Sequence, residues 1–419
     1  MSSPQKTALF LTGGGARAAY QIGVLQAIFS LLSETGWAPR KNPFDIVCGT
    51  SAGAINAAAF ACRADDFEDS VTQLLQIWRQ LEVGQVYRAD SIGVIRSGAR
   101  WLSLLSFGWL LRKWQAQPPA SLLDNNPLVS LLHKMLDLPR LDAALDAGHL
   151  SALAVSASSY TAGRHVIFYQ SGPEVAPWRR AQRMSVPQQI GVDHLLASSA
   201  IPLIFPAVPL YCGDRCEYFG DGSLREVAPI SPAIHLGASK VLVIGAGVIG
   251  GPDRSFSEYS GYPSLAQVAG HALSSIFLDG LSVDLERMSR INSTLSLLTP
   301  EQLARTALRP VRMLAITPSQ ALDNIASKHV GSLPVPIHTL LSAIGATERR
   351  GAALASYLLF ESSYTRSLIE LGQIDTLNRR DEVLAFFDVE SDQKLIVPSS
   401  HPDAWQSTPE THEVAAKTS

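Results

Sequence analysis

The pentapeptide GTSAG at 49–53 holds the first residue that could do chemistry, Ser51. It lies between a short apolar run, DIVC, and a run of small residues that predicts a helix, and Gly-x-Ser-x-Gly in that setting is typical of a nucleophile elbow. In such an elbow a sharp turn exposes the serine hydroxyl, while Gly49 and Gly53 leave room for neighbouring backbone. The start of the next helix favours negative charge on the attacked group. The alternative is a serine that only caps a helix.

A glycine-rich loop, GGGARA at 13–18, follows an apolar stretch and opens a helical pattern. Such a loop aims backbone N–H groups at something negative, either a dinucleotide pyrophosphate or an oxyanion formed during a reaction. A dinucleotide site needs an acidic residue at the end of the second strand, but Ser51 and its neighbours occupy that position. A phosphate loop would need Gly-Lys-Ser/Thr, which does not follow. We therefore expect an oxyanion hole facing Ser51, formed by the N–H groups of Gly13, Gly14, Gly15 and Ala16.

Asp221, in GDGS at 220–223, is the candidate base for the serine. A carboxylate between two glycines can approach a hydroxyl without steric obstruction, although Asp-Gly is also a common turn sequence. A carboxylate with an ordinary pKa of about 4 is a poor base for serine. The hypothesis therefore predicts that Asp221 is partly desolvated and that its pKa is raised.

Taken together, these motifs resemble the patatin-like phospholipase family. The loop GGGARAAYQIGVL, the elbow GTSAG and the tripeptide DGS match the family's three signatures in type and order, and ASSAIPLIFPAV at 197–208 resembles the segment that precedes the family's aspartate. The resemblance covers about residues 7–250 and extends more weakly into the helix that reaches Ile291. It implies a serine–aspartate dyad, in which Ser51 attacks a lipid ester and Asp221 is the general base.

The resemblance also assigns a role to Arg17, which matches the family's basic residue in the loop. We expect Arg17 to hold the loop, with contact to a lipid phosphate as the weaker alternative. The family usually has glycine at the next position, where this chain has Ala18. Since alanine disfavours positive φ, the loop must reach its shape with a negative φ at Ala18. The serine of DGS, in place of glycine or alanine, is a smaller departure.

The order of predicted elements indicates an α/β fold. Strand, loop and helix occur twice before residue 62, which favours parallel winding, and the resemblance implies a three-layer α/β/α patatin-like fold with a mostly parallel central sheet. Further strands are expected at 151–160, 164–170, 241–247 and 311–318, with a long helix at 265–291. We expect three parts: a catalytic domain at 7–325, a helical C-terminal extension at 326–390 and a disordered tail at 391–419.

Composition limits the partners. Of the 419 residues 46% are hydrophobic and 17% charged, and the net charge of −3 argues against a nucleic-acid binder. No signal peptide or membrane span is expected, which makes the cytoplasm or the inner face of a membrane the predicted location. The segment from Arg100 to Trp114, rich in tryptophan between basic ends, predicts either contact with a membrane surface or a buried lid. The chemistry requires no metal or organic cofactor.

Two other functions stay open. A Ser–His–Asp esterase would need a histidine, and His235 follows Asp221 most closely, in a segment that reads as a helix where a structural role is favoured. A membrane-associated lipid-binding protein with little catalysis is the alternative from another class.

Overall fold

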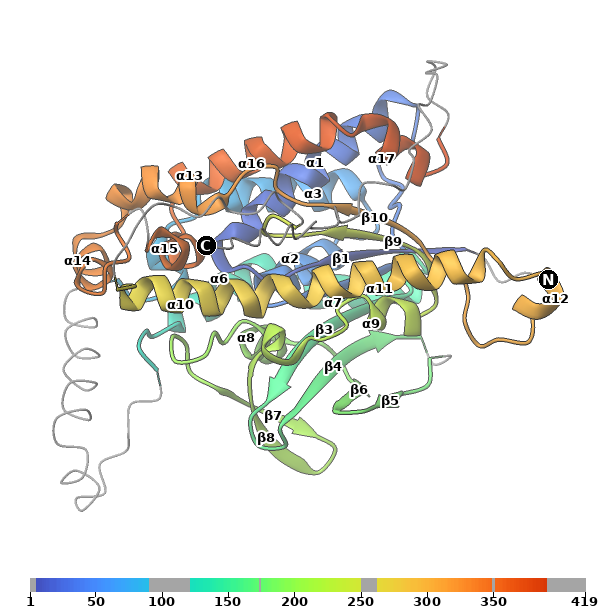
Figure 1. Cartoon of the computed structure of the whole chain (residues 1–419), viewed down its shortest axis with the longest axis horizontal. Helices are drawn as coiled ribbons and strands as arrows, with labels where there is room; N and C mark the ends of the chain where they lie inside the picture. The colour runs from blue at the N-terminus through green and yellow to red at the C-terminus, as the bar shows by residue number, and fades with distance from the viewer. Residues whose placement is uncertain (1–4, 90–120, 173–174, 250–261, 349–350, 390–419) are drawn as a thin grey trace, which may run out of the picture.

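The computed structural model describes residues 5–89, 121–172, 175–249, 262–348 and 351–389 (Figure 1). Within these ranges ten strands form one mixed sheet in the order β10-β9-β1-β2-β3-β4-β6-β5, with β8 paired to β3 and β7 to β8. The strands are β1 (Lys6–Leu11), β2 (Ile46–Thr50), β3 (Ala152–Ser159), β4 (Arg164–Ser171), β5 (Arg179–Arg180), β6 (Arg183–Pro187), β7 (Val208–Cys212), β8 (Arg215–Asp221), β9 (Ala238–Ile244) and β10 (Arg312–Ile316).

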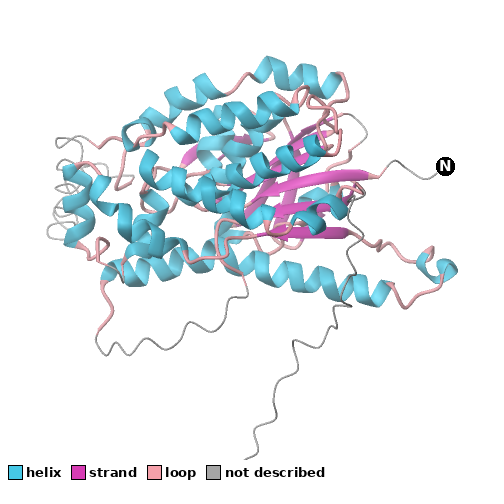
Figure 2. Ribbon diagram, turned by 90° about the horizontal axis from the view of Figure 1, so that it is seen from above, coloured by secondary structure: helices cyan, strands magenta, loops and turns pink. Residues whose placement is uncertain are grey.

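Helices lie around this sheet (Figure 2). They are α1 (Ala19–Glu34), α2 (Ala52–Ala61), α3 (Phe67–Arg79), α4 (Val83–Val86), α6 (Asn126–Met135), α7 (Leu138–Asp146), α8 (Val192–Ser198), α9 (Ser231–His235), α10 (Leu265–Ser274), α11 (Gly280–Leu295), α12 (Pro300–Leu303), α13 (Leu322–His329), α14 (Val335–Ala343), α15 (Ala352–Leu358), α16 (Ser362–Leu377) and α17 (Arg380–Phe386).

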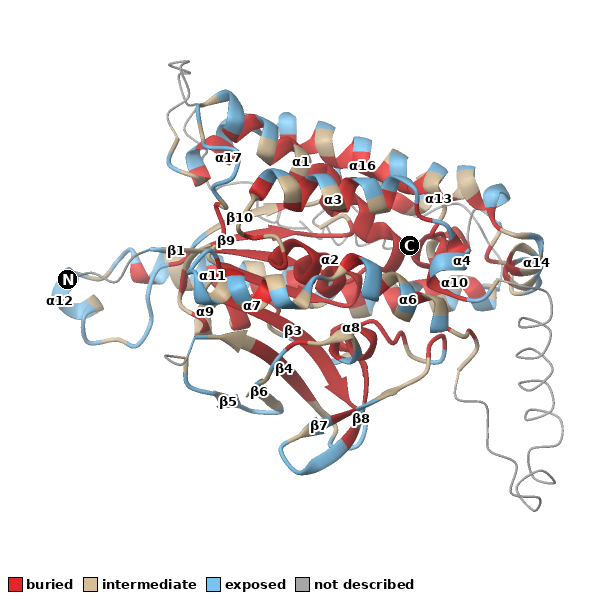
Figure 3. Cartoon of the chain, turned by 180° about the vertical axis from the view of Figure 1, so that it is seen from behind, coloured by how far each residue is buried: buried red, intermediate tan, exposed pale blue. Residues whose placement is uncertain are grey.

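The five strands β10, β9, β1, β2 and β3 are parallel, which confirms the predicted fold class. Their side chains alternate between two cores: Leu9 and Leu11 of β1 join a cluster with α1, α2 and α3, whereas Ala8 and Phe10 join one with α9 and α11. The sheet is therefore covered on both faces, as a parallel sheet requires, and Figure 3 shows its strands buried beneath helices with exposed outer faces.

The antiparallel part of the sheet was only partly predicted. β3 and β4 form the expected hairpin. The hairpin of β7 and β8 was not predicted, although β8 ends at Asp221 and pairs with the end of β3 through Ala157. Exposed and buried residues alternate irregularly along β8, and its first three residues include the charged Arg215 and Glu217. Its sequence is therefore a weak signal for a strand.

The long helix predicted at 265–291 is interrupted. α10 and α11 follow one another along the molecule (Figure 1), joined by a π-helical turn, Ser275–Asp279. Phe277 of this turn stacks on Tyr357 with ring centroids 5.1 Å apart, and it lies so close to Gly13 that a Cβ there would be 2.8 Å from the ring. The interruption therefore occurs where the helix crosses the glycine loop.

The C-terminal helix α16 packs directly on α1 (Figure 1). A Cβ on Gly23 would lie 1.9 Å from the Ile369 carbonyl oxygen, and one on Gly372 would lie 2.3 Å from the Tyr20 carbonyl oxygen. Such close backbone approach needs glycine on both helices. The division into a catalytic domain and a helical extension stays a prediction. The two predicted parts are in contact through α1 and α16.

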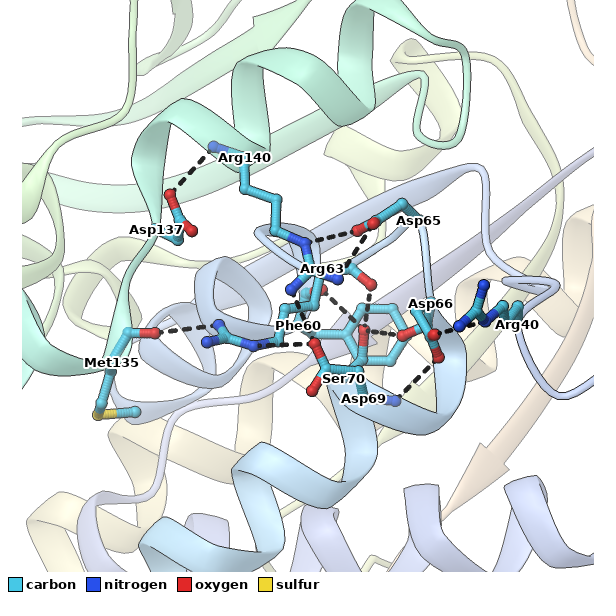
Figure 4. A network of polar contacts seen from close by, with 10 residues as sticks. All are labelled: Arg40, Phe60, Arg63, Asp65, Asp66, Asp69, Ser70, Met135, Asp137 and Arg140. Carbon is cyan, nitrogen blue, oxygen red and sulfur yellow. Dashed lines mark hydrogen bonds and ion pairs between the residues drawn. The ribbon is translucent and has the colours of Figure 1, made fainter.

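An ion network joins the segment of α6 and α7 to α2 and α3 (Figure 4). The Arg140 guanidinium donates two parallel bonds to Asp65, of 2.8 and 3.0 Å, and a third of 2.7 Å to Asp69. Arg63 lies beside Asp69 and donates to the Met135 carbonyl, at the end of α6, over 3.3 Å. Bidentate arginine–carboxylate pairs fix geometry better than single exposed pairs do, so the network holds α6 in place.

Replacement of Arg140 by methionine should lower the free energy of unfolding by about 1–2 kcal/mol, because charge-assisted bonds in a half-buried network are lost. Urea denaturation followed by circular dichroism measures this. Arg290→Met is the matched control: its pair with Glu286 is exposed, with side chains 80% and 65% accessible, and should contribute less than about 0.5 kcal/mol. Equal losses in the two variants would contradict the role given to the network.

Candidate active site

Ser51 occupies a strained turn between β2 and α2. Its φ of 58° and ψ of −131° lie in a region that non-glycine residues rarely adopt. The flanking glycines make the turn possible, because a Cβ on Gly49 would lie 2.4 Å from the Gly53 carbonyl oxygen and one on Gly53 would lie 2.3 Å from that of Leu11. The Ser198 hydroxyl accepts a bond of 2.9 Å from the backbone N–H of Ser51 and helps to hold the turn.

The Ser51 hydroxyl donates to Asp221, with 2.6 Å between Oγ and Oδ2. The second carboxylate oxygen of Asp221 accepts the backbone N–H of Ser223 at 2.9 Å. Asp221 has no exposed surface, and this burial raises its pKa to about 6, although the bonds from Ser51 and Ser223 act in the opposite direction. The raised pKa agrees with the predicted desolvation. A carboxylate with this pKa is a suitable base near neutral pH.

The sheet brings these two residues together across 170 positions of sequence. Thr50 at the end of β2 pairs with Ser156 of β3, and β3 continues alongside β8 so that Ala157 pairs with Asp221. The aspartate thus lies at the carboxyl edge of the parallel strands, where the loop after β2 presents Ser51.

The glycine loop lies at the same edge. Within the described parts of the chain, the backbone N–H groups of Gly13, Gly14, Gly15 and Ala16 make no hydrogen bond. Gly15 has a φ of 55°, and a Cβ there would lie 2.3 Å from the Tyr357 carbonyl oxygen. Ala18 has a φ of −64°, which is the negative value that its side chain predicts. The loop therefore offers unpaired donors on a backbone that only glycine allows.

Arg17 is 5% exposed and is directed into the protein. Its Nε donates to the Ser356 hydroxyl at 2.7 Å and its Nη1 to the Tyr357 hydroxyl at 3.1 Å, while the guanidinium stacks on the Tyr357 ring at 3.9 Å. These contacts fix the glycine loop to α15. They leave the guanidinium little surface with which to meet a ligand.

The Patatin-like phospholipase family model matches residues 9–234, which is more than half of the chain and includes the glycine loop, Ser51 and Asp221. The chain belongs to the patatin-like phospholipase family.

Individual known proteins are similar over shorter stretches or at low identity. An uncharacterized protein of Escherichia coli (strain K12), YjjU, is 29% identical over 116 residues, which are 28% of this chain and 27% of that protein. The chain thus matches about a quarter of the length of this relative. Among solved structures, VipD from Legionella pneumophila aligns with 17% identity and a TM-score of 0.31 over 88% of this chain and 67% of VipD. ExoU from Pseudomonas aeruginosa, in complex with SpcU, aligns with 14% identity and a TM-score of 0.24 over 92% and 79%.

In this member of the family, a pocket with almost wholly apolar walls opens onto Ser51. Its walls come mainly from α2, α3, α4, α6 and the segment before β7. The lining residues are Gly15, Ser51, Ala52, Ile55, Ile77, Trp78, Leu81, Val86, Leu128, Leu131, Met135, Ser199, Ile201, Phe205 and Phe360. Among the described lining residues, the polar side-chain groups are the hydroxyls of Ser51 and Ser199 and the indole N–H of Trp78, which donates to Asn56.

A second acid lies beside the elbow and was not predicted. The Thr50 hydroxyl donates to Glu226 Oε1 at 2.6 Å, and burial of the carboxyl group raises the pKa of Glu226 to about 7. Glu226 lies five residues after Asp221, and Thr50 directly precedes Ser51. The bond from Thr50 to Glu226 therefore joins the segment that carries Ser51 to the segment that follows Asp221. Only its proximity to DGS in the sequence could have suggested it.

The predicted structural role of His235 agrees with its surroundings. Its Nδ1 lies 2.8 Å from the Ser231 carbonyl oxygen in the same helix, and its ring stacks on Trp178 at 4.9 Å. Across the described ranges no histidine hydrogen-bonds to Ser51 or Asp221. His165 is buried against the Gly222 backbone, and burial lowers its pKa to about 4.

The segment from Arg100 to Trp114 lies outside the described residues. Among the residues that are described, no helix is long and apolar enough to cross a membrane, and no three side chains group as a metal site would need.

The value of kcat/KM should fall as the pH drops through about 6, because a protonated Asp221 cannot accept the Ser51 proton. Hydrolysis of a soluble ester from pH about 4 to 8 measures this limb. Glu226→Gln is the control, since Glu226 also titrates near neutrality. If kcat/KM of this variant no longer falls at low pH, Glu226 and not Asp221 is the group whose protonation causes the fall.

The raised pKa of Asp221 also predicts that stability falls with rising pH, whereas activity rises. Because the folded-state pKa of Asp221 exceeds its ordinary value of 3.8, the folded protein binds this proton more tightly than the unfolded chain does. The stabilisation is complete below the unfolded pKa and is lost as the pH rises through about 6. The stability of the wild type relative to Asp221→Asn should therefore fall over this range in chemical denaturation. A constant difference would contradict the shift.

Proposed function

We propose that this protein is a serine acyl hydrolase of lipid esters, of the phospholipase A or lysophospholipase type. The observation that carries the proposal is the 2.6 Å bond from Ser51 to a fully buried Asp221, at the opening of an apolar pocket. Family membership supports the choice of a lipid ester over other acyl compounds. Ser51 is the nucleophile and Asp221 the general base.

The reaction follows from this geometry. The Ser51 oxygen attacks the ester carbonyl carbon while its proton passes to Asp221 Oδ2. The resulting oxyanion is stabilised by N–H groups of the loop from Gly13 to Ala16, which have no other partner among the described residues. When the intermediate collapses, Asp221 returns the proton to the leaving alcohol and an acyl-Ser51 remains. Water, deprotonated by Asp221, then attacks the acyl carbon, and Asp221 returns the proton to the Ser51 oxygen as the fatty acid is released.

The pocket accounts for the acyl half of the substrate. A wall of leucine, isoleucine, phenylalanine and tryptophan side chains offers an alkyl chain burial at about 25 cal/mol per Å² and has almost no polar group to desolvate. In this proposal Arg17 holds the loop, since its donors bond to α15. Peripheral contact with a membrane, to which the segment from Arg100 to Trp114 could contribute, would bring the substrate to the site.

Labelling with a fluorophosphonate lipid analogue, followed by intact mass and peptide mapping, tests the dyad. Ser51 should be labelled in the wild type and in His235→Ala, and labelling should slow by about 100-fold or more in Asp221→Asn, which lacks the base. Ser51→Ala identifies the labelled residue. Circular dichroism of each variant shows that it is folded.

The other outcomes separate the alternatives. Labelling at the wild-type rate in Asp221→Asn would contradict the dyad, and its loss in His235→Ala would favour a triad. An unlabelled but folded wild type that binds lipid vesicles would favour a lipid-binding protein with little catalysis.

A further inference from the structure

The turn between β3 and β4 forms a rim beside the dyad. Ser156 of β3 is level with Thr50, and β3 continues for three further residues alongside β8. At about 3.3 Å per residue, the turn that begins at Ser159 extends about 10 Å beyond the end of β2. It therefore lies beyond the edge of the sheet where Ser51 and Asp221 meet.

This rim is rigid. The Ser159 hydroxyl donates to Glu217 at 2.7 Å and accepts the Ala162 N–H at 2.9 Å, while Thr161 accepts the Tyr218 N–H at 2.9 Å. Arg164, at the far end of the turn, forms an ion pair with Glu217, which is 4% exposed. The charge of Arg164 is therefore neutralised within the fold.

Two groups at the rim have no such partner. Tyr160 is half exposed, and its hydroxyl contacts Gly220, the residue before Asp221. Arg225 is exposed, and its Nη2 lies 3.9 Å from where a Cβ on Gly163 would be. Within the part of the chain that the structure describes, neither the Tyr160 hydroxyl nor the Arg225 guanidinium makes a hydrogen bond, and Arg225 forms no ion pair.

Arg17 is not available to bind a phosphate, which leaves Arg225 and Tyr160 as candidates. A phospholipid brings a phosphate close to the ester that is cleaved, and the glycine-loop arginine would be the obvious partner for it. The Arg17 guanidinium is buried and bonded to α15 instead. Arg225 is four residues beyond Asp221, at the end of a 3-10 turn whose length is about 2 Å per residue. A free guanidinium thus ends the short turn that begins at Asp221.

We infer that Arg225 and Tyr160 form a headgroup subsite that binds the phosphate of a glycerophospholipid or lysophospholipid while its acyl chain occupies the pocket on the other side of Ser51. This inference rests on the proposed function. The guanidinium supplies paired N–H donors and a positive charge, and the phenol supplies one further donor. The positive charge of Arg225 thereby offsets the repulsion between the phosphate and the carboxyl groups of Asp221 and Glu226.

The test compares two substrates with the same acyl chain in micelles of a neutral detergent: a lysophosphatidylcholine, which carries a phosphate, and a monoacylglycerol, which does not. In Arg225→Gln the ratio of kcat/KM for the phospholipid to that for the monoacylglycerol should fall by about tenfold or more, through KM, because a charge-assisted bond is lost. Tyr160→Phe should lower the ratio less. Glycerol 3-phosphate should inhibit the wild type competitively and Arg225→Gln more weakly.

Arg215→Gln is the matched control. It removes the same charge at the opposite end of β8, six residues from Asp221 and so about 20 Å away, and Arg215 is exposed. Its substrate ratio should equal that of the wild type.

Three results would overturn the subsite: an unchanged ratio in Arg225→Gln, an equal fall in Arg215→Gln, or a wild type that cleaves only the monoacylglycerol. Each of these results would leave the proposed acyl hydrolase activity intact and would contradict only the headgroup subsite. A wild type that cleaves neither substrate and is not labelled by fluorophosphonate overturns the function and the subsite together.

Discussion

The bond between Ser51 and Asp221 depends on a carboxylate that solvent does not reach. Burial raises the pKa of Asp221 to about 6, and the carboxylate accepts the Ser51 hydroxyl and the backbone N–H of Ser223. A salt bridge with arginine would stabilise the carboxylate but would lower its pKa and weaken it as a base. Two arginines near the site are already paired elsewhere: Arg17 is bonded to α15, and Arg164 is paired with Glu217.

Close backbone contacts build the frame around this bond. Gly53 brings α2 against the end of β1, Gly15 brings the loop against α15, and Gly23 and Gly372 bring α1 against α16. At each contact a methyl group would collide with a carbonyl oxygen. The strained φ of Ser51 persists because this frame over-determines it.

Much of this arrangement could be predicted from the sequence because its signals are local. The short apolar runs before GGGARA and GTSAG are typical of buried parallel strands, and glycine spacing indicated both loops. The fold class and the family followed from them. The roles of Ser51, Asp221 and the glycine loop remain predictions that the geometry supports.

Other features depend on contacts between distant segments. The hairpin of β7 and β8 lacks clean alternation, the π-helical turn at Ser275–Asp279 has no sequence signature, and the bond from Thr50 to Glu226 joins residues 176 positions apart. Single-sequence patterns do not report such pairings. The desolvation of Asp221 could be predicted only because the chemistry required it.

The contact of Arg17 with α15 has a consequence for biosynthesis. The partners of its guanidinium, Ser356 and Tyr357, lie 339 and 340 residues further along the chain. At a synthesis rate of about 5–20 residues per second, a ribosome needs roughly 20 to 70 s to reach them after Arg17. Until then the nascent chain has its serine and its aspartate but no α15 against which the glycine loop can be fixed. The order of translation therefore delays assembly of the proposed oxyanion hole until all ten described strands have been synthesised.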